Sequence, residues 1–554
     1  MIREQTDVVV IGGGVNGCGV ARDLALRGIK VLLLERHDIS MGTSWASSGM
    51  IHGGIRYLLS DVHTTVKSCK DAGYIRSIAP HLIFRIPILF PILKDDGLNG
   101  WINLEGADGL FSHYDRYQPY KGGKRHLRLS PDETRRVEPL LAGDLLGAVS
   151  TDEWGIDVPR LCVANALDAL EHGATIRTWT EVTALAKDGA RVVGVEFRDL
   201  LTGEHGLVRA AVVINCGGPW APGIAGKAGT TVKLRPAKGV HLVLDRRITN
   251  NAVVVQAVDG RQVFLMPHEN TSMIGTTDDD YYGDPDAIPV TEDEIKYLLE
   301  AFDRFVPRLR EARIIKTIAG IRPTLYEINK VEDDLTRDHR VVDHAKDGVE
   351  GFVSLIGGKL AAYRVMAEET ADAACRKLGR HVACTSHLTP LPGGDRVPDP
   401  NTLAKTRNLD PYAVSRLIFR QGSRAERVLS LIDERPALRD PICGCDPVME
   451  AELRHAIRHE FVRRASDLIG RCRIAEGPCQ GLQCAMRAAT IFGEEKGLAP
   501  DQVVDEAVHL LREKWRWRRP VLSGAQMAGE ELYRLVHRAL LDPALAARQE
   551  EVLG

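Results

Sequence analysis

The sequence has no long apolar stretch, no large excess of charge of either sign and few aromatic residues. Its 554 residues carry a formal net charge of -3, and 5% of them are aromatic. The charge balance gives no sign of a nucleic-acid partner. No apolar run reaches the roughly 18 residues that a membrane-spanning helix needs; Ile86–Leu93 comes nearest and contains prolines. A signal-peptide pattern is also missing, so we expect a cytoplasmic protein that reaches the inner face of the cell membrane only through partners.

What the sequence does contain is clearest at its start. Asp7–Ile11 is short and apolar, which predicts a buried parallel strand. A G-x-G-x-x-G motif follows, whose glycines allow a tight turn, a close approach to a pyrophosphate and the packing of the next helix. These glycines are Gly12, Gly14 and Gly17. We expect a helix at Val15–Leu26, a second strand at Lys30–Leu34, and Glu35 bonded to an adenosine ribose. The unit predicts dinucleotide binding, an ordinary βαβ turn being the alternative, and alone it does not separate FAD from NAD.

The segment Gly42–Tyr57, GTSWASSGMIHGGIRY, is too rich in glycine and serine for a regular amphipathic helix. Ser44, Ser47 and Ser48 are able to donate hydroxyls to phosphate or flavin groups; the alternative is a capped helix start and a turn. The segment resembles the flavin-contacting segment of FAD-dependent glycerol-3-phosphate dehydrogenases, which are glycine-oxidase-like flavoproteins. Further blocks resemble this family in the same chain order: AVVINCGGPW at 211–220, IGTTDDDYYGD at 274–284, GIRP at 320–323 and SLIGGKLAAYR at 354–364.

The resemblance implies an α/β fold class. A doubly wound FAD-binding module of the glycine-oxidase or D-amino-acid-oxidase type is interleaved with an antiparallel-sheet substrate domain, and a small helical cysteine-rich domain follows. FAD is expected without a covalent link. By resemblance, Val182 begins a strand against the adenine and Gly217 passes near the flavin. Backbone N–H groups near the flavin pyrimidine come from Gly357, Gly358 and Leu360.

We expect four parts in the chain. The oxidoreductase module takes 1–390, with its FAD domain drawn from segments near both ends and its substrate domain from the middle. A linker or reduced helical cap at 391–440 begins in a stretch rich in proline and glycine. The cysteine domain takes 441–495 and a helical tail 496–554. The expected helices are Thr291–Phe305, Asn408–Leu431, Met449–Phe461 and Ala465–Ile469, the last of them ended by Gly470.

Oxidation of a secondary alcohol needs a hydride acceptor, a base and an anchor for the rest of the substrate. By resemblance, the phosphate anchors are Arg56 of HGGIRY, Arg322 of GIRP and Lys359 of GGKL. We choose His52 as the general base because its ordinary pKa, near 6.5, suits proton abstraction at neutral pH; a structural histidine is the alternative. Two secondary candidates are Tyr57, next to Arg56, and Arg337, which lies in LTRDH, a stretch that resembles a family block near the substrate.

The 11 cysteines are not expected to form disulfides in a reducing compartment. Cys443 and Cys445 form C-x-C, and Cys479 and Cys484 form C-x-x-x-x-C. Four thiolates in two pairs fit a soft, sulfur-ligated metal site. The pattern, in which glycines flank Cys479, resembles the bacterioferritin-associated-ferredoxin-like [2Fe–2S] domain. Zinc and metal-free buried thiols are the alternatives. Cys472 fits neither pair.

The order of FAD module, linker and cysteine domain resembles the catalytic subunits of the anaerobic branch of the family. The segment Ser44–Tyr57 looks more like the aerobic, single-subunit enzymes. The resemblance implies oxidation of sn-glycerol 3-phosphate to dihydroxyacetone phosphate by hydride transfer to FAD. Electrons then pass through the cluster and further membrane-side subunits to quinone. An oxidation of another polyol phosphate, a 2-hydroxy acid or an amine, and a non-catalytic electron carrier, are the other hypotheses.

Overall fold

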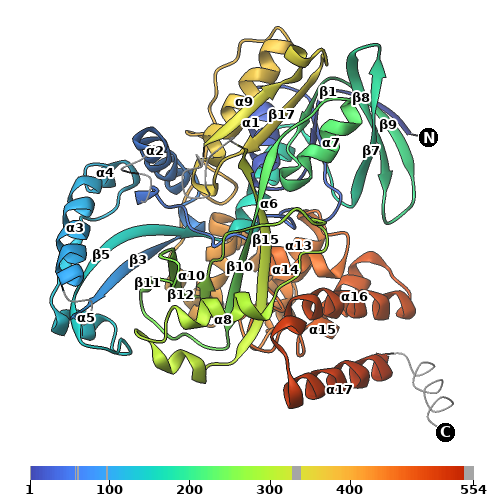
Figure 1. The fold of residues 1–554 in the computed structure, drawn as a ribbon. Coiled ribbons are helices and arrows are strands. Elements are labelled where there is room, and N and C mark those ends of the chain that lie inside the picture. Colours follow the sequence, from blue (N-terminus) through green and yellow to red (C-terminus); the bar gives the residue numbers. More distant parts are fainter. Residues whose placement is uncertain (1, 56–57, 59–60, 95–97, 327–337, 542–554) are drawn as a thin grey trace.

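The computed structural model describes residues 2–55, 58, 61–94, 98–326 and 338–541 (Figure 1). The first of its sheets is built on the N-terminal unit of β1 (Ile2–Ile11), α1 (Val15–Leu26) and β2 (Val31–Leu34). Its strands run in the order β16-β17-β9-β1-β2-β6, and all neighbours are parallel except the edge pair β16 and β17. The other strands are β6 (Thr175–Arg177), β7 (Thr180–Asp188), β8 (Arg191–Asp199), β9 (His205–Asn215), β16 (His339–Asp343) and β17 (Phe352–Gly357).

Helices cover both faces of this sheet. α1 packs against α6 (Val158–Glu171) and α9 (Tyr363–Lys377), and the three share one apolar core. α7 (Ala221–Ala228) belongs to a second core on the other face, together with the β7–β8 hairpin. β1, β2, β16 and β17 come from segments near both ends of the first 390 residues, whereas β6 to β9 come from the middle of this region. The doubly wound fold class is confirmed.

The second sheet, called the substrate sheet below, comes from the middle of the chain. Its order is β14-β10-β13-β12-β11-β3-β5-β4, with β15 on the free side of β10, and only β11 and β3 pair in parallel. Its strands are β3 (Ile83–Leu93), β4 (Leu127–Leu129), β5 (Leu145–Ile156), β10 (Leu234–Leu244), β11 (Ala252–Gln256), β12 (Gln262–His268), β13 (Thr271–Gly275), β14 (Asp279–Asp280) and β15 (Ile314–Leu325). Its helices are α2 (Val62–Ile78), α3 (Leu98–Tyr114), α4 (Gln118–Lys121), α5 (Pro131–Val137) and α8 (Glu292–Glu300).

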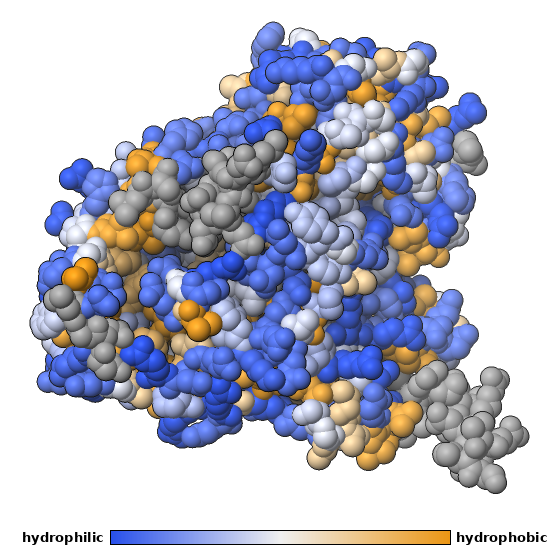
Figure 2. All heavy atoms as spheres, viewed as in Figure 1, coloured by the Kyte–Doolittle hydropathy of each residue, from blue (hydrophilic) through white to orange (hydrophobic). Residues whose placement is uncertain are grey.

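The C-terminal third is helical, coloured orange to red in Figure 1. α10 (Pro400–Arg407), α11 (Pro411–Gln421) and α12 (Ala425–Glu434) share a small core of their own. Another core gathers α13 (Glu450–His459), α14 (Leu468–Cys472), α15 (Ala485–Lys496) and α16 (Pro500–Arg518). α17 (Gly524–Leu541) ends the described chain, and Figure 2 shows an apolar patch there, where Leu532, Leu535 and Val536 are exposed. Among the described helices, none is long and apolar enough to cross a membrane.

Three expected helices differ from the structure. α8 begins at the expected cap, Thr291, but ends at Glu300. The helix expected at Asn408–Leu431 is two helices, since Gly422 interrupts it with a φ of +56°. Gly470 does not end its helix, which continues to Cys472. A glycine inside a helix costs about 1 kcal/mol relative to alanine, and burial of its neighbours Leu468, Ile469 and Cys472 outweighs that cost. The three boundaries between the four expected parts stay predictions.

Candidate active site

A cavity of about 950 Å³ is lined by residues of both sheets. This volume lies at the upper end of the range of cofactor sites. Most of the site residues that the sequence predicts line it: Gly12, Gly14, Glu35, Ser44, Ser47, Ser48, His52, Val182, Gly217, Arg322, Gly357, Gly358, Lys359 and Leu360. Gly17 lies just behind the wall, in α1. Arg56, Tyr57 and Arg337 lie outside the described residues. The structure therefore brings together residues more than 300 positions apart, while their individual roles stay predictions.

The glycines of the N-terminal turn are required by close backbone contacts. A Cβ on Gly12, whose φ is +106°, would lie 2.7 Å from the carbonyl oxygen of Cys216. A Cβ on Gly17 would lie 1.8 Å from the carbonyl oxygen of Gly12 itself. Gly14 is the extended residue before α1, so the positive end of the helix opens into the cavity. The turn has the geometry that a pyrophosphate-binding loop needs.

Glu35, Ser44 and Ser47 line the cavity and also form hydrogen bonds with neighbouring parts of the chain. Glu35 accepts hydrogen bonds from the backbone N–H groups of Gly13 (2.5 Å) and His37 (2.8 Å). Burial raises the pKa of Glu35, and these two hydrogen bonds act in the opposite direction. Ser44 Oγ accepts from Val15 N–H at the start of α1 (2.9 Å), and Ser47 Oγ donates to the Ser44 carbonyl (3.0 Å). The hydroxyls expected to serve phosphate or flavin thus first hold their own loop in place.

The loop of His52 lies on a buried cluster of polar residues, Glu153, Tyr114 and Lys121. Glu153 faces the cavity, accepts a hydrogen bond from Gly53 N–H (3.2 Å) and another from Tyr114 Oη (2.7 Å), and pairs with the buried Lys121. A Cβ on Gly53 would lie 2.1 Å from Tyr114 Oη. The space behind Gly53 is filled by Tyr114, so a residue without a side chain is needed here to keep the loop in place.

His241 is a cavity residue that sequence reasoning missed. It lies on β10, and its Nε2 is 2.9 Å from Ser48 Oγ. Burial, helped by the Arg322 charge, lowers the pKa of His241 to about 3, so the ring is neutral at pH 7. The only signal in the sequence is one histidine in the apolar strand KGVHLVL at 238–244.

Arg322 is oriented by its neighbours on β10 and after β13. Its Nη1 donates to Asp278 Oδ1 (3.0 Å) and its Nη2 to Thr276 Oγ1 (2.9 Å). A Cβ on Gly239 would lie 2.4 Å from Nη2, so the glycine makes room for the guanidinium. Arg322 and Lys359 bring two cations to the cavity, which suits an anionic substrate.

Each cysteine of the first predicted pair, Cys443 and Cys445, contacts one cysteine of the second pair, Cys479 and Cys484. Cys443 shares a hydrogen bond with Cys484, which lowers the pKa of Cys443 to about 6. Cys445 and Cys479 share another, while burial is the main cause that raises the pKa of Cys445 to about 11. A Cβ on Gly477 would lie 2.2 Å from that of Cys445, so this glycine lets the two loops meet. In the described part of the chain, no three His, Cys, Asp or Glu side chains are arranged to hold a metal ion.

A nucleotide-binding turn at the carboxyl ends of the strands of a doubly wound sheet, opening into a cavity shared with an antiparallel sheet, fits a flavin-dependent oxidoreductase. Residues 7–364 match the family described as FAD dependent oxidoreductase, and residues 384–503 match the C-terminal domain of alpha-glycerophosphate oxidase. One subunit of the anaerobic glycerol-3-phosphate dehydrogenase of Escherichia coli (strain K12) is 34% identical over 97% of each chain. A glycerol-3-phosphate dehydrogenase of Mycobacterium leprae is 34% identical over 90% of this chain and 86% of its own.

The solved structures agree with the sequence relatives. The glycerol-3-phosphate dehydrogenase of Bacillus halodurans, complexed with FAD, aligns with a TM-score of 0.74 at 25% identity and covers 94% of this chain and 96% of its own. A glycine oxidase of Bacillus cereus shares the fold, with a TM-score of 0.52 at 22% identity. The chain therefore belongs to the FAD-dependent glycerol-3-phosphate dehydrogenase family, and the family resemblance drawn from its motifs is confirmed.

Proposed function

We propose that the protein oxidises sn-glycerol 3-phosphate to dihydroxyacetone phosphate. The observation that carries this proposal is one cavity that holds the nucleotide turn, the cations Arg322 and Lys359, and the histidines His52 and His241. The names of the relatives support the substrate, and the FAD in the Bacillus halodurans structure supports the cofactor. Bound FAD supplies a two-electron hydride acceptor. The substrate carbon gives up a hydride, its hydroxyl gives a proton to a base, and a ketone results.

The base is His52 rather than His241. A pKa of about 3 means that protonating His241 at pH 7 costs about 5 kcal/mol. His241 is therefore a poor proton acceptor and serves as a neutral hydrogen-bonding group beside Ser48. His52 is held at the cavity wall by the bond from Gly53 N–H to Glu153. Arg322, together with Lys359, binds the phosphate and keeps the substrate in one orientation.

Anaerobic bleaching of the flavin tests this proposal. Glycerol 3-phosphate should reduce the bound flavin within one turnover, and the product should be dihydroxyacetone phosphate. Bleaching by an amine or a 2-hydroxy acid, with none by glycerol 3-phosphate, would show that the protein catalyses another oxidation on the same fold. No bleaching by any of these compounds would favour an electron carrier without catalytic activity.

The phosphate anchor has its own prediction. We expect Arg322→Ala to raise KM for glycerol 3-phosphate roughly ten- to a hundred-fold, because one charge-assisted contact worth about 1.5–3 kcal/mol is lost. Arg322→Lys should recover part of the loss, since it keeps the charge but not the fork. Steady-state kinetics on glycerol provides the comparison. An equal loss on glycerol and on its phosphate would remove the phosphate assignment.

The seat of the His52 loop leads to a further prediction. We expect Gly53→Ala to lower kcat at least about ten-fold, because the new Cβ meets Tyr114 Oη at 2.1 Å and Cys69 Sγ at 2.3 Å. FAD content should remain near that of the wild type, since the nucleotide turn is untouched. Gly106→Ala in α3 is the control, because a Cβ there meets nothing within 4 Å. An unchanged kcat in Gly53→Ala would show that the position of this loop does not limit turnover.

We also propose that Cys443, Cys445, Cys479 and Cys484 hold a [2Fe–2S] cluster. Two contacts between the loops, Cys443 with Cys484 and Cys445 with Cys479, support this proposal, and Gly477 permits the second of them. Four cysteine thiolates are the ligand type that such a cluster uses. The cluster supplies one-electron transfer when bound. We further propose that other subunits, at the inner face of the cell membrane, take these electrons to quinone. This chain is then cytoplasmic and reaches the membrane through those subunits. Iron and acid-labile sulfide in equal amounts would support it, and stoichiometric zinc would contradict it.

A further inference from the structure

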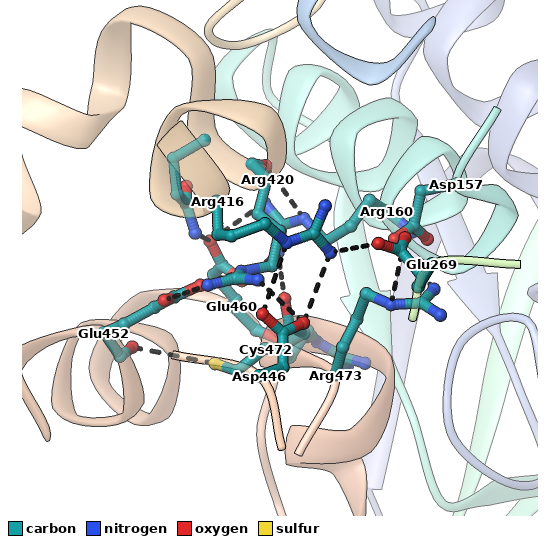
Figure 3. A network of polar contacts seen from close by, with 12 residues as sticks. Asp157, Arg160, Glu269, Arg416, Arg420, Asp446, Glu452, Glu460, Cys472 and Arg473 are labelled. Atoms are coloured by element: carbon teal, nitrogen blue, oxygen red, sulfur yellow. Dashed lines mark hydrogen bonds and ion pairs between the residues drawn. The ribbon is translucent and has the colours of Figure 1, made fainter. Parts of the chain in front are cut away.

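Buried charged residues join the C-terminal helices to the rest of the protein. Figure 3 shows the central part of this network. Arg160 on α6 pairs with Glu460 after α13 (2.5 Å), and Arg473 after α14 pairs with Asp157 at the start of α6 (3.1 Å). The network reaches the loop of Cys443 and Cys445 through Asp446. A second buried group of ion pairs, around Glu476, reaches the loop of Cys479 and Cys484.

The first cysteine loop is held by the turn between β12 and β13. Asp446 follows Cys445, and its carboxylate accepts two hydrogen bonds from Arg416, both 3.2 Å long. Arg416 also pairs with Glu269 of the turn (2.6 Å; Figure 3). The next residue of the turn, Asn270, donates to the carbonyl oxygen of Cys445 itself (3.3 Å). One turn of the substrate sheet thus contacts the backbone of a cysteine directly and reaches the side chain of Asp446 through Arg416.

The second cysteine loop is held by β15. Glu476 lies three residues before Cys479, and its carboxylate pairs with Lys316 on β15 and Lys514 on α16, both at 2.5 Å. The side chains of Lys316, Glu476 and Lys514 are 3%, 10% and 5% exposed. Removing one member of a buried pair leaves a charge without its partner, so such a contact resists opening.

The elements that hold the cysteine loops also form the wall of the flavin cavity. Lys316 and Arg322 stand on the same face of β15, because side chains alternate along a strand, and the six residue steps from one to the other span about 20 Å. Trp45 lies behind this wall, between the cavity and the cysteine domain. Its neighbours Ser44 and Ala46 line the cavity, while its ring lies 5.7 Å from Lys316 Nζ and packs against the core that contains Cys443 and Cys484.

We propose that Glu476 is a positioning residue, which holds the loop of Cys479 and Cys484 against the cavity wall through Lys316. This inference rests on the proposed function. Each substrate molecule delivers two electrons with its hydride and one proton to the base. The electrons leave one at a time through the cysteine site to a one-electron acceptor. The rate of electron transfer falls steeply with the distance between the flavin cavity and the cysteine site. The pair of Glu476 with Lys316 keeps this distance short, with Trp45 packed between the two sites.

The test uses the full-length protein loaded with FAD and iron, in the wild type and in Glu476→Gln. Anaerobic stopped-flow mixing with glycerol 3-phosphate follows flavin bleaching and, separately, the visible and EPR signals of the cluster. We expect unchanged flavin bleaching and a fall of at least about ten-fold in the rate of cluster reduction. In the iron-free protein, amide exchange over residues 474–484 should become at least about ten-fold faster.

The chain offers a closely matched control in Glu495→Gln. Glu495 is also 10% exposed and also pairs with two cations, Arg454 and Arg458. It lies on α15, which begins directly after Cys484, but both of its partners lie on α13 and not on the substrate sheet. We expect wild-type cluster reduction and wild-type exchange in this variant. Lys316→Met should reproduce the effect of Glu476→Gln, and Lys316→Arg should retain most of the wild-type rate.

The outcomes separate this inference from the proposed function. Wild-type exchange and wild-type cluster reduction in Glu476→Gln would overturn the inference, as would an equal slowing of flavin bleaching and cluster reduction. A wild-type protein that binds no cluster would contradict the proposed function, while the exchange measurement on the iron-free protein would still decide the positioning role. If Glu476→Gln does not fold, Lys316→Met decides by the same two measurements.

Discussion

Gly17→Ala is expected to leave the protein without FAD. The new Cβ would lie 1.8 Å from the carbonyl oxygen of Gly12, a distance that no packing change in a side chain can relieve, because the obstacle is backbone. α1 must then move away from the turn between β1 and α1. The helix N-terminus and the backbone of Gly14 would no longer face the pyrophosphate together. The turn binds the pyrophosphate through backbone groups held in this geometry. We therefore expect complete loss of FAD rather than a graded fall in affinity.

The measurement is the flavin absorbance per chain after purification, followed by acid precipitation. In the wild type, the flavin should stay in the supernatant, since its binding is expected to be non-covalent. Gly226→Ala in α7 is the control, because a Cβ there meets nothing within 4 Å. That change should keep FAD and stabilise the helix by up to about 1 kcal/mol. A Gly17→Ala protein with stoichiometric FAD would show that the turn does not hold the pyrophosphate.

The local features of the fold were accessible from the sequence because short-range chemistry determines them. α1 has the expected bounds, Val15–Leu26. α8 begins at Thr291 through a capping box with Glu294, a pattern of four consecutive residues. Its early end was not accessible: the chain turns after Glu300, and Phe302 enters the core of the substrate sheet. β1 also starts earlier than expected, at Ile2, because its first residues pair with β9, some 200 positions away.

The same division applies to the site. His52, Arg322 and Lys359 stand in motifs that resemble those of the family, and the structure places all three at one cavity. His241 stands in no such motif, and its place in the cavity follows from the pairing of β10 with β13 and β15. The cluster of Glu153, Tyr114 and Lys121 was also missed, because its members come from separate elements and meet only in the folded protein.

The cysteine site leads to the other prediction with a large effect. We expect Cys484→Ser to abolish the visible and EPR signals of the cluster, because a hydroxyl is a poor replacement for a thiolate toward iron. Flavin bleaching by glycerol 3-phosphate should remain near the wild-type rate, since the cavity residues His52 and Arg322 lie in the other module. Quinone reduction through the proposed partner subunits should fall to background. The variant thus separates the oxidation of substrate from the exit of electrons.

Cys472→Ser is the matched control within the same domain. Cys472 is fully buried like Cys484, but its Sγ lies beside the Glu452 carbonyl oxygen (3.8 Å) and belongs to neither cysteine pair. If the cluster signals depend on the two cysteine pairs, Cys472→Ser retains those signals. This variant also measures how much stability is lost when a buried cysteine of this domain becomes serine. Wild-type quinone reduction in a Cys484→Ser protein that lacks the cluster would contradict the relay. The four cysteines would then have a structural role, and the electrons would have to leave directly from the flavin cavity.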